Sequence, residues 1–185
     1  MPAEFADSKS SKKVRSNLYL VGFMGTGKST VGYRVAQMLG MPFLDSDHEI
    51  EKRVGMKVAE IFENLGESRF REMEAQFVDQ WQPRSGNVIS CGGGLVTNKS
   101  LLNKIQQMGV VVVLYASIDT LEKRLSRDQN RPLMQVENPK QRIEELLEER
   151  RPIYQNAGVG IMTDGHTSQE VADHVIRIYL DKINS

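Results

Sequence analysis

An excess of charge of one sign is missing from this sequence, and cysteine is nearly missing as well. The 24 basic residues balance the 24 acidic ones over 185 residues, and Cys91 is the single cysteine. This balance leaves no global field that would attract nucleic acid or a membrane surface, so we expect neither as a partner. One cysteine cannot form an internal disulfide, which fits a reducing compartment, and we expect the chain in the cytoplasm.

Long hydrophobic runs are also absent. The longest run, Val110–Ala116, is far shorter than the roughly 20 residues that span a bilayer. Residues 1–16 carry charges with no hydrophobic core after them, so they do not form a secretory signal. We expect residues 1–16 to be a polar, mobile extension. Residues 17–185 predict one domain, large enough to bury a substantial core, and we expect a monomer.

From Asn17 onward, short apolar runs alternate with longer stretches of helical periodicity. This alternation is typical of β–α–β units and of a parallel sheet. We expect strands at residues 18–21, 42–44, 88–91, 110–115 and 159–163. Five strands with helices between them predict a three-layer α/β/α sandwich around a five-stranded parallel sheet. Ligands of such sheets bind outside the carboxyl ends of the strands.

Helical periodicity fills most of the remaining chain. A first helix follows residue 29 and ends at Gly40, and further helices are expected at 50–54, 58–64, 67–82, 99–108, 118–127, 140–155 and 168–183. Ser168 is the expected N-cap of the last helix. Residues 128–139 contain two prolines and many polar side chains, which predicts a mobile loop. We expect this loop to belong to a lid over about 124–139.

The segment 22–29, GFMGTGKS, matches the phosphate-loop pattern G-x-x-x-x-G-K-[ST] between a predicted strand and a predicted helix. Its glycines let successive backbone N–H groups point at one phosphate, and the helix N-terminus adds a positive dipole end. Lys28 supplies a charge to the β and γ oxygens, and the Ser29 hydroxyl is placed to ligate Mg²⁺. A glycine-rich turn without a ligand is the alternative, but it would rarely have both flanking elements.

The phosphate loop alone leaves the reaction open. Guanine-specific switch proteins carry an Asn-Lys-x-Asp motif, and neither Asn-Lys pair of this chain is followed by that aspartate. A large motor ATPase would need a longer chain. The leading interpretation is therefore a small-molecule kinase that uses ATP as co-substrate and Mg²⁺ as cofactor.

Polar residues at the ends of the second and third strands are candidates for an acceptor site. Asp45 and Asp47 lie on one face of an extended segment, although both could instead cap the next helix. Arg71 and Glu74 share a helical face, although a solvated charge is the default for such an arginine. The triplet 92–94 is Gly-Gly-Gly, which allows a ligand to approach the backbone closely, and a flexible turn is the alternative.

Together these blocks resemble the shikimate kinases. The matching segments are GFMGTGKST, FLDSD, IFENLGESRFREME, CGGG, RPL at 131–133 and ERRPIY at 149–154, in this order from about Leu18 to Thr163. The resemblance implies a P-loop kinase fold with an acceptor-binding segment at about 46–75. It also implies ATP-dependent phosphorylation of the 3-hydroxyl of shikimate, giving shikimate 3-phosphate and ADP in aromatic amino acid biosynthesis.

The resemblance assigns the acceptor side of the reaction residue by residue. Asp47 would hydrogen-bond the ring hydroxyls, including the one that accepts phosphate. Arg71 and Arg150 would hold the carboxylate, and Gly93 would offer it a backbone N–H. The full substrate-binding set is Asp47, Arg71, Gly92, Gly93, Gly94 and Arg150. Phe62 and Phe70 would wall the pocket.

The resemblance also assigns the nucleotide side. The expected catalytic residues are Lys28, Asp47 and Arg131, the last on the lid and in reach of the transferring phosphate. Asp45 would hold Mg²⁺ through water, beside Ser29. Arg124 would lie against the adenine. The full ATP-binding set is Gly25, Thr26, Gly27, Lys28, Ser29, Thr30, Arg124 and Arg131.

Some alternatives stay open at this point. From pattern alone either Arg150 or Arg151 could face the site, and only the family's R-x-P-x-Y register selects Arg150. Ser90 and Cys91 stand after the third strand, where many phosphate-loop enzymes place a second Mg²⁺ ligand. A kinase of another hydroxy acid, such as gluconate, and a slowly hydrolysing regulatory module are the rival functions.

Overall fold

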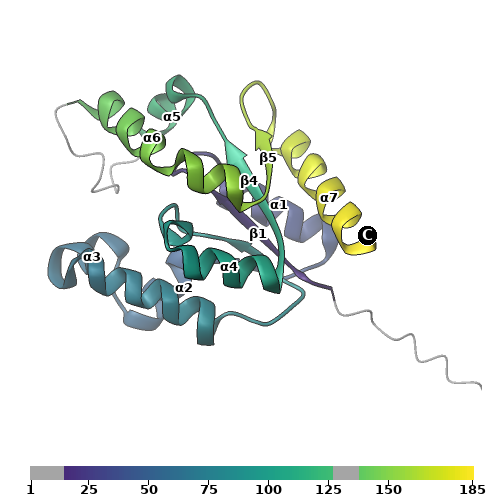
Figure 1. Cartoon of the computed structure of the whole chain (residues 1–185), viewed down its shortest axis with the longest axis horizontal. Helices are drawn as coiled ribbons and strands as arrows, with labels where there is room; N and C mark the ends of the chain where they lie inside the picture. Colours follow the sequence, from purple (N-terminus) through teal and green to yellow (C-terminus); the bar gives the residue numbers. More distant parts are fainter. Residues whose placement is uncertain (1–14, 127–137) are drawn as a thin grey trace, which may run out of the picture.

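The fold is a five-stranded parallel sheet between two layers of helices (Figure 1). The computed structural model describes residues 15–126 and 138–185. The strand order is β2-β3-β1-β4-β5. The strands are β1 (Asn17–Gly22), β2 (Phe43–Asp45), β3 (Val88–Ser90), β4 (Gly109–Tyr115) and β5 (Val159–Met162). The predicted three-layer α/β/α sandwich is confirmed.

Strand β1 is buried along its whole length because helices cover both faces of the sheet. Leu18 and Leu20 pack into one core with α1 (Lys28–Leu39) and α7 (Ser168–Asn184). Tyr19 and Val21 point the other way, into a second core. This two-sided burial explains why the strand is a continuous apolar run rather than an alternating one.

The second core lies under five helices. These are α2 (Ser46–Val54), α3 (Val58–Gln76), α4 (Lys99–Met108), α5 (Ile118–Leu125) and α6 (Pro139–Ala157), with a π-type turn η1 (Phe77–Trp81) and a 3-10 turn η2 (Leu95–Thr97). Three of the helices carry predicted acceptor-site residues: Asp47 on α2, Arg71 on α3 and Arg150 on α6. Within the described ranges, no helix has the length and apolar character needed to cross a bilayer.

One expected helix boundary is confirmed and another is wrong. Gly66 was expected to separate two helices, and its non-helical φ of 79° and ψ of 164° do divide α3 into two helical parts at a kink. The expected N-cap Ser168 is wrong, because Thr167 caps α7. The Thr167 Oγ1 accepts from the Glu170 N–H at 3.2 Å, and a Glu170 carboxylate oxygen accepts from the Thr167 N–H at 2.7 Å. This reciprocal capping box satisfies two backbone donors, which Ser168 could not do.

The parallel sheet collects the predicted site residues at one edge. The register places Asp45 beside Ser90 and Ser90 beside Leu20. The segments that follow β1, β2 and β3 therefore begin side by side at their carboxyl ends. Gly22 pairs with Leu114 of β4, and a Cβ at Gly22, whose φ is 140°, would overlap the Leu114 carbonyl oxygen. Only glycine lets β1 turn into the following loop at this place.

We expect Gly22→Ala to lower the free energy of unfolding by about 3 kcal/mol, because it combines backbone strain with overpacking against the sheet. Gly55→Ala is the matched control: its φ of 74° is also positive, but nothing lies within 4 Å of the added Cβ. It should cost only about 1 kcal/mol. Urea unfolding followed by far-UV circular dichroism measures both, and equal losses would contradict the steric explanation.

Candidate active site

The loop between β1 and α1 curls its backbone around the N-terminus of α1. Gly25 and Gly27 have positive φ angles of 81° and 92°, which other residues rarely adopt. Thr26 closes the loop by donating from its hydroxyl to the Phe23 carbonyl at 2.8 Å, and the Lys28 ammonium donates to the same carbonyl at 2.9 Å. The loop thus has the curled backbone, the helix N-terminus and the adjacent cation that a phosphate site needs.

Hard oxygen atoms meet beside this loop. The Ser29 hydroxyl donates to Asp45 Oδ2 at 2.6 Å and lies 3.3 Å from the Ser90 hydroxyl. Mg²⁺ prefers such oxygens and keeps several of its own waters, so this donor set fits Mg²⁺ bound through a small number of protein atoms. In residues 15–126 and 138–185 no group of three or more His, Cys, Asp and Glu side chains could hold a metal ion.

The two aspartates after β2 have different roles in the structure. Asp45 is the N-cap of α2, because its Oδ1 accepts from the Asp47 N–H at 3.2 Å. Its other oxygen accepts from the Ser29 hydroxyl, so the capping interpretation is confirmed for Asp45, and its role toward Mg²⁺ stays a prediction. Asp47 instead lies against the glycine turn, where a Cβ at Gly92 would overlap its Oδ1.

Each glycine of the triplet allows a different close approach. A Cβ at Gly92 would strike Asp47, and a Cβ at Gly94 would strike the guanidinium of Arg71. A Cβ at Gly93 would lie 3.3 Å from the backbone nitrogen of Met24 in the phosphate loop. The interpretation of the triplet as a merely flexible turn is therefore wrong, since three neighbours pack against its bare backbone.

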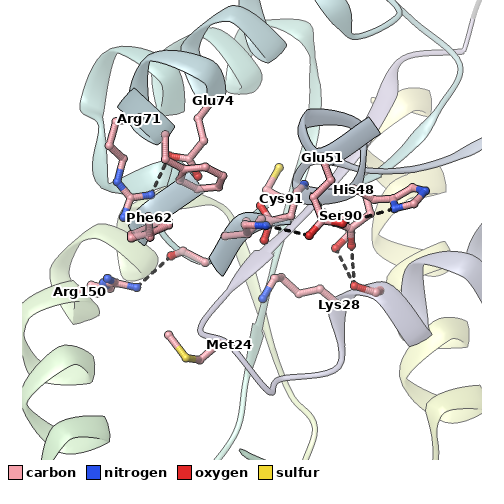
Figure 2. A pocket seen from close by; sticks show the side chains of 18 residues that line it. Met24, Lys28, His48, Glu51, Phe62, Arg71, Glu74, Ser90, Cys91 and Arg150 are labelled. Atoms are coloured by element: carbon pink, nitrogen blue, oxygen red, sulfur yellow. Dashed lines mark hydrogen bonds and ion pairs between the residues drawn. The ribbon is translucent and has the colours of Figure 1, made fainter. Parts of the chain in front are cut away.

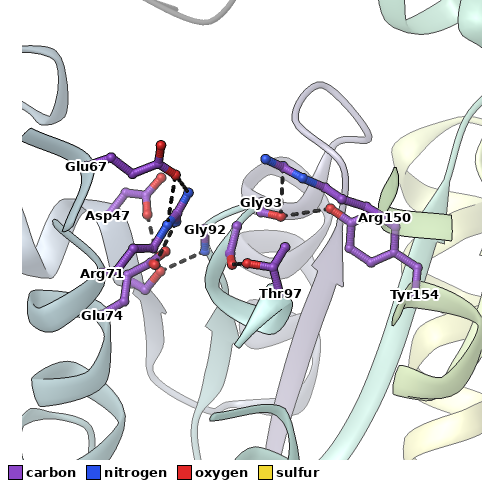
Figure 3. A network of polar contacts seen from close by, with 11 residues as sticks. Asp47, Glu67, Arg71, Glu74, Gly92, Gly93, Thr97, Arg150 and Tyr154 are labelled. Carbon is purple, nitrogen blue, oxygen red and sulfur yellow. Dashed lines mark hydrogen bonds and ion pairs between the residues drawn. The ribbon is translucent and has the colours of Figure 1, made fainter. Parts of the chain in front are cut away.

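Arg71 is held between two carboxylates rather than solvated. Its Nη1 donates to Glu74 Oε2 at 2.7 Å, and its Nη2 donates to Glu67 Oε1 at 2.7 Å. These partners lie three and four residues away on α3, so the helix itself orients the guanidinium. Figure 3 shows Arg71 on one side of the glycine turn and Arg150 on the other.

Glu74 was noted in the sequence only as a helical neighbour of Arg71. Its side chain is 1% exposed, and burial raises the pKa of its carboxyl to about 7, although Arg71 acts in the opposite direction. Asp47 adds to the increase by like-charge repulsion. A carboxyl that titrates near neutral pH therefore lies directly behind the predicted acceptor-binding arginine.

The structure selects Arg150 over Arg151. Arg151 is exposed and forms an ion pair with Glu148 on the surface of α6. Arg150 is 6% exposed, and its Nη1 donates to the Gly93 carbonyl at 3.4 Å. The Tyr154 hydroxyl donates to the same carbonyl at 2.7 Å. The Gly93 carbonyl therefore accepts two hydrogen bonds from α6, whereas the expected role of the Gly93 N–H toward a ligand carboxylate stays a prediction.

A cavity of about 400 Å³ joins the two halves of the predicted site. Its walls include Lys28, Ser29 and Asp45 from the phosphate side, and Arg71 and Arg150 from the acceptor side (Figure 2). Asp47, Phe62, Phe70 and the glycine triplet complete this lining. The volume suits a small organic ligand. The Phe62 and Phe70 rings lie 5.0 Å apart and supply an apolar wall.

Cys91 lines the same cavity but is not a reactive thiol. It is 1% exposed, and burial raises the pKa of its thiol well above the usual range. A buried, protonated thiol is a poor nucleophile. Cys91 therefore packs as a small apolar residue, as its position predicted.

A second cavity, of about 490 Å³, extends from the other side of the phosphate loop. Arg124 lines this cavity, and its Nη1 donates to the Gly25 carbonyl at 3.0 Å and to the Thr163 hydroxyl at 3.3 Å. Residues 25–31, including Thr30, line it as well. Arg124 is therefore in contact with the loop, and its expected position against the adenine stays a prediction.

No sequence pattern singled out Asp164, which holds the N-terminus of α5, the helix that carries Arg124. Its carboxylate accepts from the Ser117 N–H at 2.8 Å, from the Ser117 hydroxyl at 2.7 Å and from the Thr120 hydroxyl. Although burial raises its pKa, the bonds from Thr120 and Ser117 hold the pKa of Asp164 below its usual range. The partner positions are 44 and 47 residues away, so only the fold brings them together. Arg131 and most of the expected lid lie outside the described residues.

Comparison with known proteins agrees with this geometry. A family model described as shikimate kinase matches residues 24–179. The shikimate kinase of Thermodesulfovibrio yellowstonii is 45% identical over 163 residues, which cover 88% of this chain and 94% of that protein. The shikimate kinase of Acinetobacter baylyi is 44% identical over 165 residues, covering 89% and 92%.

Solved structures give the same result. The shikimate kinase of Acinetobacter baumannii in complex with shikimate superposes with a TM-score of 0.86 at 40% identity, covering 91% of this chain and 94% of that one. A gluconokinase of Sinorhizobium meliloti shares only the fold, with a TM-score of 0.59 at 16% identity. Because the family model spans most of the chain and the curated relatives exceed 40% identity along it, this chain belongs to the shikimate kinase family.

Proposed function

We propose that this chain transfers the γ-phosphoryl group of ATP to the 3-hydroxyl of shikimate, and that it does so in the cytoplasm. The observation that carries the proposal is the single cavity whose walls include both the phosphate-loop lysine and a pair of guanidinium groups. Such an arrangement holds two anionic substrates side by side. Phosphoryl transfer depends mainly on this positioning and on neutralising charge.

The nucleotide tail binds to the loop of residues 25–30. Backbone N–H groups and the N-terminus of α1 face the β and γ phosphates, and Lys28 places its charge on the γ oxygens as they become more negative. Arg124 lies on the far side of the loop, in contact with the Gly25 carbonyl, where it covers the base. Arg131, for which the family resemblance predicts a contact with the transferring phosphate, completes this set.

Ser29 and Asp45 would hold Mg²⁺, and the family resemblance implies that Asp45 would do so through water. When bound, Mg²⁺ neutralises charge on the β and γ phosphates. The Ser29 hydroxyl and the Asp45 carboxylate already face one another at 2.6 Å. The α2 N-terminus fixes Asp45 through the capping bond from the Asp47 N–H, so the ligand set is oriented before binding.

The acceptor binds between α2, α3 and α6. Arg71 and Arg150 clamp its carboxylate, since planar guanidinium groups pair with carboxylates through two parallel hydrogen bonds. Asp47, packed against Gly92, accepts the hydrogen bond of the reacting hydroxyl and orients it toward the γ phosphate. Phe62 and Phe70 line the cavity and exclude water from the space beside the ring of the acceptor.

A coupled ADP-release assay tests the proposed function. Shikimate at millimolar concentration should give ATP- and Mg²⁺-dependent ADP release, whereas gluconate should give none above the rate without acceptor. A regulatory module would release ADP at the same slow rate with either acid. Turnover with gluconate alone would reassign the acceptor.

Lys28→Ala should lower kcat by about 10²- to 10³-fold, because the transition state loses the cation beside the γ phosphate. Lys104→Ala is the matched control, since Lys104 is a surface lysine paired with Asp79. Its kcat should stay within about twofold of the wild type. Steady-state kinetics with saturating shikimate measures both. Normal turnover of Lys28→Ala would exclude the loop as the reaction site.

Arg71→Ala should weaken acceptor binding by about 2–4 kcal/mol, because it removes a charged hydrogen-bond donor to the carboxylate. The KM for ATP should change little. Arg69→Ala serves as control on the same helix, since Arg69 is 51% exposed and forms its ion pair with Glu72 away from the cavity. Separate KM values for ATP and shikimate test this prediction. An equal loss of affinity for both substrates would show that Arg71 supports the fold rather than binding the acceptor.

A further inference from the structure

The acceptor cavity contains a carboxyl group that the proposed reaction does not use. Glu74 lines the cavity from α3, and its Oε2 accepts from Arg71 Nη1 at 2.7 Å. Its Oε1 is buried and has no hydrogen-bond partner among residues 15–126 and 138–185. A buried carboxylate oxygen without a donor is costly, and a bound proton is one way to remove that cost.

The charges around Glu74 come from four elements. On its own helix, Arg71 is a direct partner and Glu67 shares that arginine. Arg150 of α6 lowers the pKa of Glu74 by charge attraction from across the cavity. Cys91, which follows β3, stays neutral because burial raises the pKa of its thiol.

Asp47 lies on α2, the fourth of these elements. It has the same charge as an ionised Glu74 and is half-buried against the glycine turn. A Cβ at Gly92 would overlap Asp47 Oδ1 and lie 3.2 Å from Glu74 Oε1. Two carboxylates therefore face one small space beside the acceptor site, and both cannot easily keep a negative charge there.

We propose that Glu74 is a proton-linked positioning residue, which holds Arg71 in place and takes up one proton when the acceptor carboxylate binds. The inference rests on the proposed function, since the ligand is shikimate. The balance is simple: the free site, one acceptor anion and one proton from solvent combine into a complex in which Glu74 is neutral. No covalent bond other than the new carboxyl O–H is formed.

The physical reason is competition for one guanidinium. Arg71 already pairs with two carboxylates, and a bound acceptor adds a third negative group while it displaces water. Each of these changes favours the neutral form of Glu74. A protonated Glu74 can still accept from Arg71 through its carbonyl oxygen. The O–H of protonated Glu74 can donate toward Asp47 or the ligand, which would give Glu74 Oε1 a hydrogen-bond partner.

The sign of the pH effect follows from this scheme. Below the pKa of free Glu74, which is about 7, the residue is already neutral, and the acceptor binds at full affinity without proton uptake. As the pH rises above 7, binding must recruit the proton, and the affinity falls by up to about tenfold per pH unit. The acceptor carboxyl stays ionised throughout this range and contributes no dependence of its own.

Isothermal titration calorimetry of the full chain with shikimate tests the proposal directly. Measurements at pH 7.5 in buffers of different ionisation enthalpy give the number of protons taken up. We expect roughly three quarters of a proton for the wild type, since about a quarter of free Glu74 is already protonated at that pH.

Glu74→Gln should bind shikimate with no proton uptake and with an affinity that is constant from about pH 6.5 to 8.5, because the amide keeps a hydrogen bond to Arg71 but cannot titrate. Glu67→Gln is the matched control. It removes the negative charge of the other carboxylate partner of Arg71, but Glu67 is 60% exposed, so the proton uptake of this variant should equal that of the wild type.

The outcomes are distinguishable. Wild-type binding without proton uptake, or full uptake retained in Glu74→Gln, overturns the inference. If Glu74→Gln fails to fold, the ¹³C carboxyl shift of Glu74 in the wild type replaces it, and a pKa that does not rise on saturation with shikimate overturns the inference. A wild type that does not bind shikimate refutes the proposed function instead.

Discussion

Charged side chains in the acceptor cavity are kept away from water, and most of the local structure follows from that constraint. Arg150 and Glu74 are almost fully buried, so each needs a partner of opposite charge or a hydrogen bond. Arg71 is the oppositely charged partner of Glu74, and the Gly93 carbonyl accepts one hydrogen bond from Arg150. In the proposed function, the two guanidinium groups of this cavity also bind the carboxylate of the acceptor.

The glycine turn makes this arrangement possible because its backbone lies where side chains would otherwise be. Asp47, Arg71 and the Met24 backbone each approach a different glycine of the triplet. One short segment after β3 thereby sets the distances between α2, α3 and the phosphate loop. The carbonyl of Gly93 also joins α6 to the turn through Tyr154, so four elements meet at one piece of bare backbone.

The nucleotide side depends more on local sequence and less on distant contacts. The phosphate loop closes on itself through Thr26 and Lys28, which both donate to Phe23. The contacts that orient Arg124 are long-range, since Asp164 anchors α5 from the loop after β5. Association of these two segments depends on β4 and β5 pairing in the sheet, so the fold, rather than any motif, completes this part of the site.

The sequence by itself determined the sheet architecture, the phosphate loop and the order of the acceptor motifs, because buried parallel strands and curled glycine loops have local signatures. The strand predictions agree with the structure to within one or two residues at each end. The choice of Arg150 over its neighbour, the true cap of α7 and the pairing of Asp164 were decided by tertiary structure. So was the buried state of Glu74, since on a helical pattern alone it is an ordinary i, i+3 partner of Arg71 and nothing local reveals how much water reaches it. Burial, and the pKa that follows from it, are properties of the space between elements, which no local stretch of the chain encodes.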